Sequence, residues 1–167
     1  MRSIKILLLL LSVTGTALSQ DMNNERLEAI LTQNTDSIEG GFGRWQITYK
    51  EAPMLVLTDQ TNDRMRIIMP ITDGTTLSKD LMEACLIANF HTALDVKYAL
   101  SDQLLWAVYV HPLSPLTEDQ VKSALSQVYS AAVTFGTTFS STDLLFGGGE
   151  PAAPQEEKTP ALELKKG

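Results

Sequence analysis

The chain has 167 residues, a formal net charge of −7, a single cysteine and 44% hydrophobic residues. The negative charge disfavours binding to nucleic acid or to an anionic membrane surface, because both of these partners are negatively charged themselves. One cysteine excludes an internal disulfide, so a folded domain of this chain has to be stabilised by its hydrophobic core.

The first 19 residues have the layout of a cleaved secretory signal peptide. Arg2 and Lys5 give a basic start, residues 6–11 are all apolar, and a small-Leu-small site ends at Ser19. The apolar run is far shorter than the roughly 20 residues of a membrane-spanning helix. We therefore predict that residues 1–19 are a signal peptide and that the mature chain is soluble and exported, either to the periplasm or outside the cell.

The segment after the signal peptide predicts a helix and then a strand. Residues 21–34 carry apolar side chains at helical spacing, and glycines at positions 40, 41 and 43 interrupt this pattern. Residues 44–50 then alternate strictly between apolar and polar side chains, which is typical of a half-buried strand. The apolar phase consists of Trp45, Ile47 and Tyr49, and we assign it to the core.

Two further strands are predicted at residues 54–58 and 65–71, on either side of a polar segment. That segment, residues 59–63, has part of the pattern of a calcium-binding loop. However, Arg64 occupies the place of the required glycine and no bidentate glutamate follows at the right distance. We therefore interpret it as a hairpin turn in a three-stranded meander.

The second half of the chain predicts a helix, a hairpin and another helix. The second helix should start at a cap residue, Thr76 or Ser78, and end within residues 89–93. Residues 96–100 and 104–110 then form the two strands of the hairpin.

The last predicted helix opens with a capping box at Thr117–Gln120 and carries apolar residues at helical spacing as far as Phe135. The fold class is therefore α+β, with a five-stranded, antiparallel-rich sheet packed by helices. Residues 20–146 should form this single domain. Residues 147–167 are acidic and rich in proline and have too few apolar side chains to fold, so we predict a disordered tail.

The order of elements resembles the YbjN family and, more distantly, the class I chaperones of type III secretion and the YbjN-like peptide-binding chaperones. The residues that carry this resemblance are Leu86, Asn89 and Phe90 late in the second helix, the hairpin 96–108, and residues 116–120 at the start of the last helix. The resemblance covers about residues 24–140.

The resemblance implies an α+β domain whose relatives are non-enzymatic and often dimeric, and bind extended peptide segments or act in regulation. It thus implies a protein or peptide partner, with a homodimer as a further option. The chain departs from these relatives in one respect. They usually act in the cytosol, whereas this sequence begins with a predicted export signal.

The residue types that commonly carry catalysis or bind metals do not form a site in the sequence. His91 and His111 lie on different predicted elements with no cysteine or carboxylate at ligand spacing, and Cys85 has apolar neighbours. Residues 41–46 start like a dinucleotide-binding motif but lead into a strand and lack the third glycine. We expect no catalytic residue, no metal, no cofactor and a non-enzymatic function.

Two of the predicted strands have more hydrophobic residues than a sheet with one covered face requires, because both of their faces are apolar. The excess side chains form a predicted partner-binding face that consists of Leu55, Leu57, Ile68, Leu105 and Tyr109. Three other arrangements are compatible with the same pattern. The strands could be central and covered on both faces, or the last helix and residues 144–146 could fold over them. The second face could also pair two copies of the chain.

Overall fold

The computed structural model of the chain describes residues 21–142. The elements in chain order are α1 (Asn24–Asn34), β1 (Ser37–Gly41), β2 (Arg44–Tyr49), β3 (Ala52–Asp59), β4 (Arg64–Asp73), a short 3₁₀ helix (Gly74–Thr76), α2 (Lys79–His91), β5 (Val96–Ser101), β6 (Leu104–His111) and α3 (Glu118–Val133). The structure confirms the α+β class.

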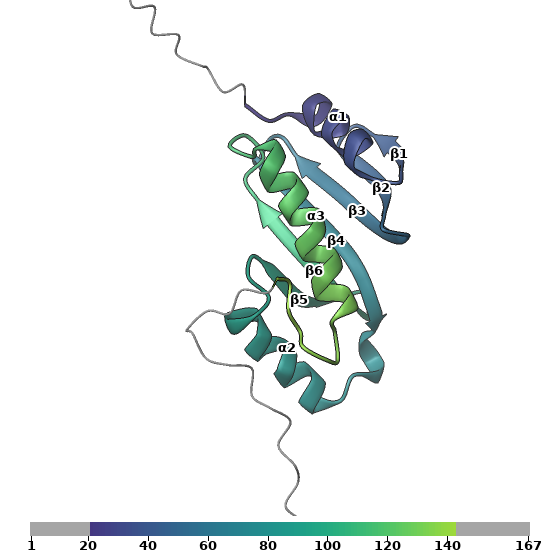
Figure 1. Ribbon diagram of the computed structural model, residues 1–167, viewed down its shortest axis with the longest axis vertical. Coiled ribbons are helices and arrows are strands. Elements are labelled where there is room, and N and C mark those ends of the chain that lie inside the picture. The colour runs from purple at the N-terminus through teal and green to yellow at the C-terminus, as the bar shows by residue number, and fades with distance from the viewer. Residues whose placement is uncertain (1–20, 143–167) are drawn as a thin grey trace, which may run out of the picture.

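One antiparallel sheet contains all six strands, in the order β1-β2-β3-β4-β6-β5. Helices α1 and α3 lie over the same face of this sheet, and α2 lies at the end where β5 forms the edge (Figure 1). In the described part of the chain, no helix lies over the opposite face. We call this second side of the sheet the open face.

The expected strand count of five was wrong because β1 was missed. Residues 37–41 pair with β2. Because Gly40 and Gly41 have no side chains, this segment lacks the apolar and polar alternation by which strands were predicted. Gly40 has φ +96°, and a Cβ atom there would lie 2.4 Å from the carbonyl oxygen of Arg44. Only glycine fits at this position, so the residue that we interpreted as a break is required by the hairpin.

The hairpin turns are short, and their central residues have left-handed backbone conformations. Phe42 and Gly43 connect β1 to β2 with φ values of 53° and 88°. Asp102 and Gln103 connect β5 to β6 with φ values of 51° and 64°. Two-residue turns of this hand match the twist of the strands and fix their register. The register of β5 against β6 determines which side chains of β6 reach the open face.

The helices begin at the kinds of residue that the sequence predicted. Ser78 caps α2 by accepting a hydrogen bond from the backbone N–H of Leu81, which confirms one of the two expected caps. Thr117 and Gln120 form the predicted capping box of α3. Such caps satisfy backbone donors that have no partner within the helix.

The hydrophobic core lies between the sheet and the helices α1 and α3. Trp45 and Ile47 of β2 are each 1% exposed, as the alternation predicted, whereas Tyr49 is half-buried. The indole Nε1 of Trp45 donates to a carboxylate oxygen of Glu28 on α1 at 3.2 Å. The helices complete the core with Leu27, Ile30 and Leu31 from α1 and Val121, Ala124, Leu125, Val128 and Ala131 from α3.

Two of the sequence predictions concern segments outside the described residues. These are the signal peptide at residues 1–19 and the tail at residues 147–167, and both stay predictions. Within residues 21–142, the helices are too short or too polar to cross a membrane.

Candidate partner-binding face

The open face carries a row of apolar side chains across its three central strands. Leu55 of β3 pairs with Ile68 of β4, and Ile68 pairs with Val108 of β6. Residues paired in this way project their side chains to the same side of the sheet, about 5 Å apart. All three side chains are half-buried by their neighbours in the sheet, although no helix of the described chain covers them.

The apolar row extends into a larger group, which we call the apolar block. It consists of Leu55, Leu57, Ile68, Pro70, Leu104, Trp106, Val108 and Val110. Val110 is 49% exposed, Pro70 is also exposed, and the other side chains of the block are half-buried. A contiguous group of this kind on a sheet surface is typical of a site that binds another protein.

Trp106 is the largest side chain of the apolar block. Its Nε1 donates to the backbone oxygen of Ser101 at 3.1 Å, so the polar atom of the indole is already satisfied. The rest of the ring is half-buried and apolar. Buried or covered tryptophans contribute large contact areas at protein interfaces. This residue can therefore add apolar contact to a bound partner without leaving an unsatisfied donor.

Three of the five predicted site residues lie on the open face. These are Leu55, Leu57 and Ile68, and their role in binding stays a prediction. The other two, Leu105 and Tyr109, were placed on the wrong face. They are 2% and 5% exposed and belong to the core under the helices. In β6 the open face carries the alternate residues instead.

The physical reason for this correction is the register of the β5–β6 hairpin. The two-residue turn pairs Ser101 with Leu104, so that Lys97 lies beside Val108. Because Lys97 is on the polar phase of β5, its neighbour Val108 lies on the same, solvent-facing side. The turn residues Asp102 and Gln103 were the signal that sequence reasoning did not use.

Two arginines lie in the last row of the apolar block, on either side of Leu57. Arg44 and Arg66 pair with Leu57 from opposite sides, so the three residues form one row across β2, β3 and β4. Both arginines are exposed. Sequence reasoning missed them because each one is an ordinary polar residue of an alternating strand, and only the pairing of the strands places them beside Leu57.

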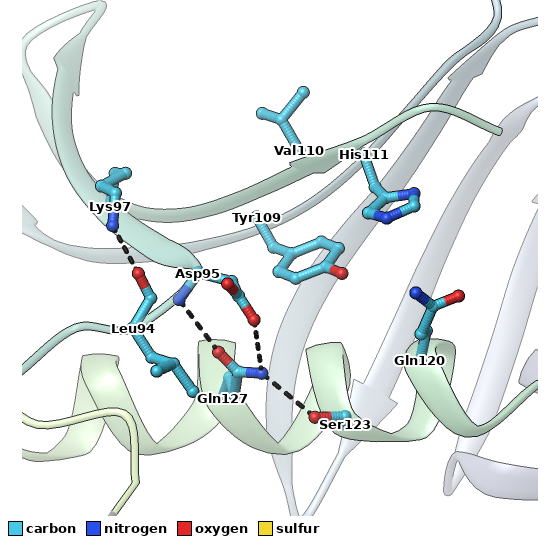
Figure 2. Close-up of a pocket in the computed structure, with 9 residues that line it drawn as sticks. All are labelled: Leu94, Asp95, Lys97, Tyr109, Val110, His111, Gln120, Ser123 and Gln127. Atoms are coloured by element: carbon cyan, nitrogen blue, oxygen red, sulfur yellow. Dashed lines mark hydrogen bonds between the residues drawn. The ribbon is translucent and has the colours of Figure 1, made fainter. Parts of the chain in front are cut away.

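A separate hollow lies between α3 and the strands β5 and β6, near the start of β5. Its volume is about 450 Å³, and Figure 2 shows the nine residues that line it. Gln127, which is 4% exposed, donates to Ser123 at 3.0 Å and to the Asp95 carboxylate at 3.3 Å, and it accepts from the Asp95 backbone N–H. These bonds tie α3 to the loop before β5.

Strand β6 adds two aromatic side chains to this hollow, and Lys97 of β5 and Gln120 of α3 also line it. The rings of Tyr109 and His111 stack with their centroids 6.1 Å apart. Burial, with a smaller effect of the Asp95 carboxylate, raises the pKa of Tyr109, so its phenol stays neutral at physiological pH. The hollow therefore presents polar groups beside the Asp95 carboxylate and the Lys97 ammonium, and several of these groups are already hydrogen-bonded within the chain.

The other candidate residues of the sequence lie apart. His91 ends α2, next to Phe90, while His111 ends β6 at the hollow. Cys85 is buried in the core, and burial raises the pKa of its thiol. Within residues 21–142, no group of three His, Cys, Asp or Glu side chains could hold a metal ion.

A third surface feature is an exposed apolar stripe on α2. Met82, Leu86 and Phe90 follow one another at a spacing of four residues and are 38%, 69% and 77% exposed. Residues four apart lie on the same side of a helix, and Ile87 lies next to this row with an exposure of 55%. The α2 stripe is thus apolar and uncovered in the described chain.

The comparisons with known proteins give a likeness in structure alone. No protein-family model matches the chain, and no curated protein matches its sequence. The fold is similar to that of the type III secretion chaperone SycH of Yersinia pestis, solved in complex with a stable fragment of YscM2. The TM-score is 0.53 at 18% sequence identity, over 67% of this chain and 98% of the other.

A second similar structure is the chaperone–effector complex HopA1–SchA. It matches with a TM-score of 0.53 at 11% identity, over 67% of this chain and 94% of the matched chain. Identities this low establish a shared fold. The chain therefore has the α+β fold of type III secretion chaperones, with three helices and a six-stranded antiparallel sheet.

Proposed function

We propose that this protein is an exported, chaperone-like binding module that holds a segment of a protein partner on the open face of its sheet. The observation that carries this proposal is the apolar block, which is contiguous across β3, β4 and β6 and has no covering element among residues 21–142. The proposal assigns binding to the protein and no catalysis.

The structural neighbours support a protein as the partner. Both are chaperones whose structures contain a second protein, a fragment of YscM2 in one case and an effector complex in the other. The resemblance to YbjN proteins, which rests on the sequence alone, is compatible with the same kind of partner. An extended segment suits this face, because apolar side chains from alternate residues of the segment can pack on the block.

Burial of the block can supply a useful affinity. Covering about 400 Å² of apolar surface is worth roughly 10 kcal/mol before the costs of association are subtracted. Lost translational freedom and the ordering of a partner segment consume most of that amount. What is left corresponds to micromolar binding, which suits a partner that has to be released.

The proposal is tested by site-specific photocrosslinking. A photoreactive side chain is placed at position 57 on the open face and, as a matched control, at the exposed position 83 on α2. We expect adducts with a heterologous protein from position 57 and none of the same protein from position 83. Adducts of equal yield at both positions, or none at position 57, would contradict the proposal.

Export is the second part of the proposal, and it depends on residues 1–19. We expect the N-terminal sequence of the mature protein to start at Gln20 or within two residues of it, because the small residues Ala17 and Ser19 precede that bond. A mature protein that still contains Met1 would contradict this part. The outcome also decides whether partners are to be sought among exported proteins.

A homodimer without a client is the second candidate function, and the α2 stripe favours it. Sedimentation velocity over a range of concentrations is the test. If Phe90→Asp converts a stable dimer to a monomer while Leu57→Asp does not, the α2 stripe pairs two copies and the open face stays free. A protein that is monomeric at every concentration would eliminate this candidate.

A further inference from the structure

Positive charge gathers at one end of the apolar block, in a chain whose net charge is −7. Arg44 and Arg66 lie on either side of Leu57, on β2 and β4. Strands are about 4.8 Å apart, so the two Cα atoms are separated by about 10 Å. The only salt bridge among residues 21–142 is Lys122–Glu118 on α3. Neither arginine therefore has an acidic partner within the described chain.

Two shallow depressions lie beside Leu57, and each of them is lined by one of the two arginines. The first, of about 380 Å³, contains Arg44 together with Leu55 and Leu57. The second, of about 180 Å³, contains Arg66 together with Leu57. Leu57 is the ridge that both depressions share. Each of them thus combines an apolar wall with a guanidinium group.

The acidic side chains near these depressions offset part of the positive charge without forming a salt bridge to Arg44 or Arg66. Glu39 lines the first depression without forming a salt bridge to Arg44. Asp59 lines the second, but both of its carboxylate oxygens accept hydrogen bonds from Asn62 in the turn. Arg64, which also lines the second depression, donates to the backbone oxygen of Asp63. Three arginines and two carboxylates line the depressions, so the region has a net positive charge in an acidic chain, and neither Arg44 nor Arg66 is held in a salt bridge by any other residue between 21 and 142.

We infer that the segment held on the open face is acidic as well as apolar, with a carboxylate on each side of an apolar residue, in the order acid-x-apolar-x-acid. This inference rests on the proposed function. The central apolar side chain packs on Leu57, and the two carboxylates enter the depressions to bind Arg44 and Arg66.

The spacing of an extended chain fits this arrangement. Side chains two residues apart point to the same side and are about 6.7 Å apart, so the two acidic residues are about 13 Å apart. The arginine Cα atoms are about 10 Å apart, and their long side chains bridge the difference. Guanidinium groups bind carboxylates through two parallel hydrogen bonds, which adds orientation to the contact.

The ion pairs with the arginines and the burial of the apolar block contribute different amounts of binding free energy. An exposed ion pair contributes only about 0.2–1 kcal/mol, so the arginines alone could not hold a segment. Burial of the apolar block supplies most of the affinity. The arginines then decide which apolar segments bind and in which register, because a like charge placed opposite them is strongly disfavoured.

The test uses three short labelled peptides that share a central Ser-Leu-Ser sequence. The residue on each side of this sequence is Glu in the first peptide, Gln in the second and Lys in the third. Binding to the mature chain, residues 20–167, is measured by fluorescence anisotropy at low salt and by tryptophan emission. A change in this emission is assigned to Trp106 of the apolar block, because the other tryptophan, Trp45, is buried in the core. We expect the Glu peptide to bind about tenfold more tightly than the Lys peptide, and added salt to reduce this difference.

Charge reversal provides the decisive comparison. In the double variant Arg44→Glu and Arg66→Glu, the preference should invert, so that the Lys peptide binds more tightly than the Glu peptide. An inverted preference also demonstrates that the variant is folded. The matched control is Lys79→Glu, an exposed residue at the start of α2, which should leave the wild-type preference unchanged.

Three outcomes would overturn the inference, and they are distinguishable. If the Glu, Gln and Lys peptides bind equally well and all change Trp106 emission, the acidic preference is wrong while the proposed function stands. If no peptide binds or changes this emission, the proposed function fails as well. If self-association of the chain covers Trp106 instead, a second copy occupies the open face.

Discussion

The side chain of Asn89 on α2 forms two hydrogen bonds with the backbone of Tyr98 on β5, in the way that the backbone of a neighbouring strand would. The backbone N–H of Tyr98 donates to the Asn89 side-chain oxygen at 2.7 Å, and the Asn89 side-chain nitrogen donates to the Tyr98 carbonyl oxygen at 3.2 Å. Because β5 is an edge of the sheet, these backbone groups would otherwise be free to pair with another chain. Helix α2 therefore closes this edge with one side chain.

We predict that Asn89→Ala lowers the free energy of unfolding by about 1–2 kcal/mol, because two backbone groups of a half-buried region lose their partner. The variant should also self-associate at high concentration through the uncovered edge. Urea denaturation and light scattering measure the two effects. Glu83→Ala, on the exposed side of α2, is the control and should stay within about 0.5 kcal/mol of wild type.

A second link joins the β3–β4 turn to the segment before α3. The Asp63 carboxylate accepts hydrogen bonds from the backbone N–H of Ser114 at 2.6 Å and from its hydroxyl at 2.9 Å. The backbone bond is the larger cause of the lowered pKa of Asp63, and the hydroxyl and the nearby Arg64 lower it further. The link favours the ionised form of this aspartate in the folded state.

A lowered pKa in the folded state means that the ionised carboxylate stabilises the fold. Its contribution should be complete above the ordinary value of 3.8 and disappear as the pH falls through the folded-state pKa. We predict that Asp63→Asn, which tolerates the same left-handed backbone, makes the urea midpoint less dependent on pH in this acidic range. An unchanged pH dependence would show that the aspartate is not linked to stability.

Much of the fold could be predicted because local patterns and caps agreed with each other. The alternation of β2, the caps at Ser78 and Thr117, and the turn at residues 59–63 each agree with the structure. Strand β1 could not be found in this way. Its backbone pairs with β2, but two of its five residues are glycines without a side-chain pattern.

The candidate site was predicted only in part, because it depends on contacts between strands. Leu57 is recognisable as a surplus apolar residue, but its row with Arg44 and Arg66 exists only through pairing with β2 and β4. The two apolar phases of β6 could not be told apart by composition. A shift of one residue exchanges the faces, so the wrong phase put Leu105 and Tyr109 in the site.

Tyr98 stabilises the core through its hydroxyl group. The hydroxyl donates to the backbone oxygen of Ala131 in the last turn of α3 at 2.7 Å, where helix carbonyls lack partners within the helix. Burial is the main reason why the pKa of this phenol rises from 10.0 to about 12. The neutral form is thus favoured in the folded state.

This raised pKa predicts a loss of stability in alkali. The contribution of neutral Tyr98 is present below the ordinary value of 10.0 and is lost as the pH rises toward about 12. Urea midpoints should therefore fall above pH 10 in the wild type and fall less steeply in Tyr98→Phe. The same variant should cost about 1 kcal/mol at neutral pH, because the Ala131 carbonyl loses its donor. Equal alkaline slopes would contradict the assignment.

Replacement by alanine at positions 57 and 105 tests whether the two leucines lie on opposite faces of the sheet. Leu105 is 2% exposed beneath the helices, so Leu105→Ala should lower the free energy of unfolding by about 2–5 kcal/mol through lost burial and a residual cavity. Leu57 is only half-buried, on the open face, so Leu57→Ala should cost less than about 1 kcal/mol.

For peptide binding we expect the opposite order, with a larger effect of Leu57→Ala than of Leu105→Ala. Leu57→Ala removes the ridge between the two arginine depressions and should weaken the capture of an apolar segment severalfold, measured by anisotropy with the labelled Glu peptide. Leu105→Ala, studied at a temperature where it is still folded, should bind the same peptide with wild-type affinity because its side chain does not reach the open face. If Leu57→Ala were as destabilising as Leu105→Ala and left binding intact, Leu57 would belong to the core and the open face would not be the binding surface.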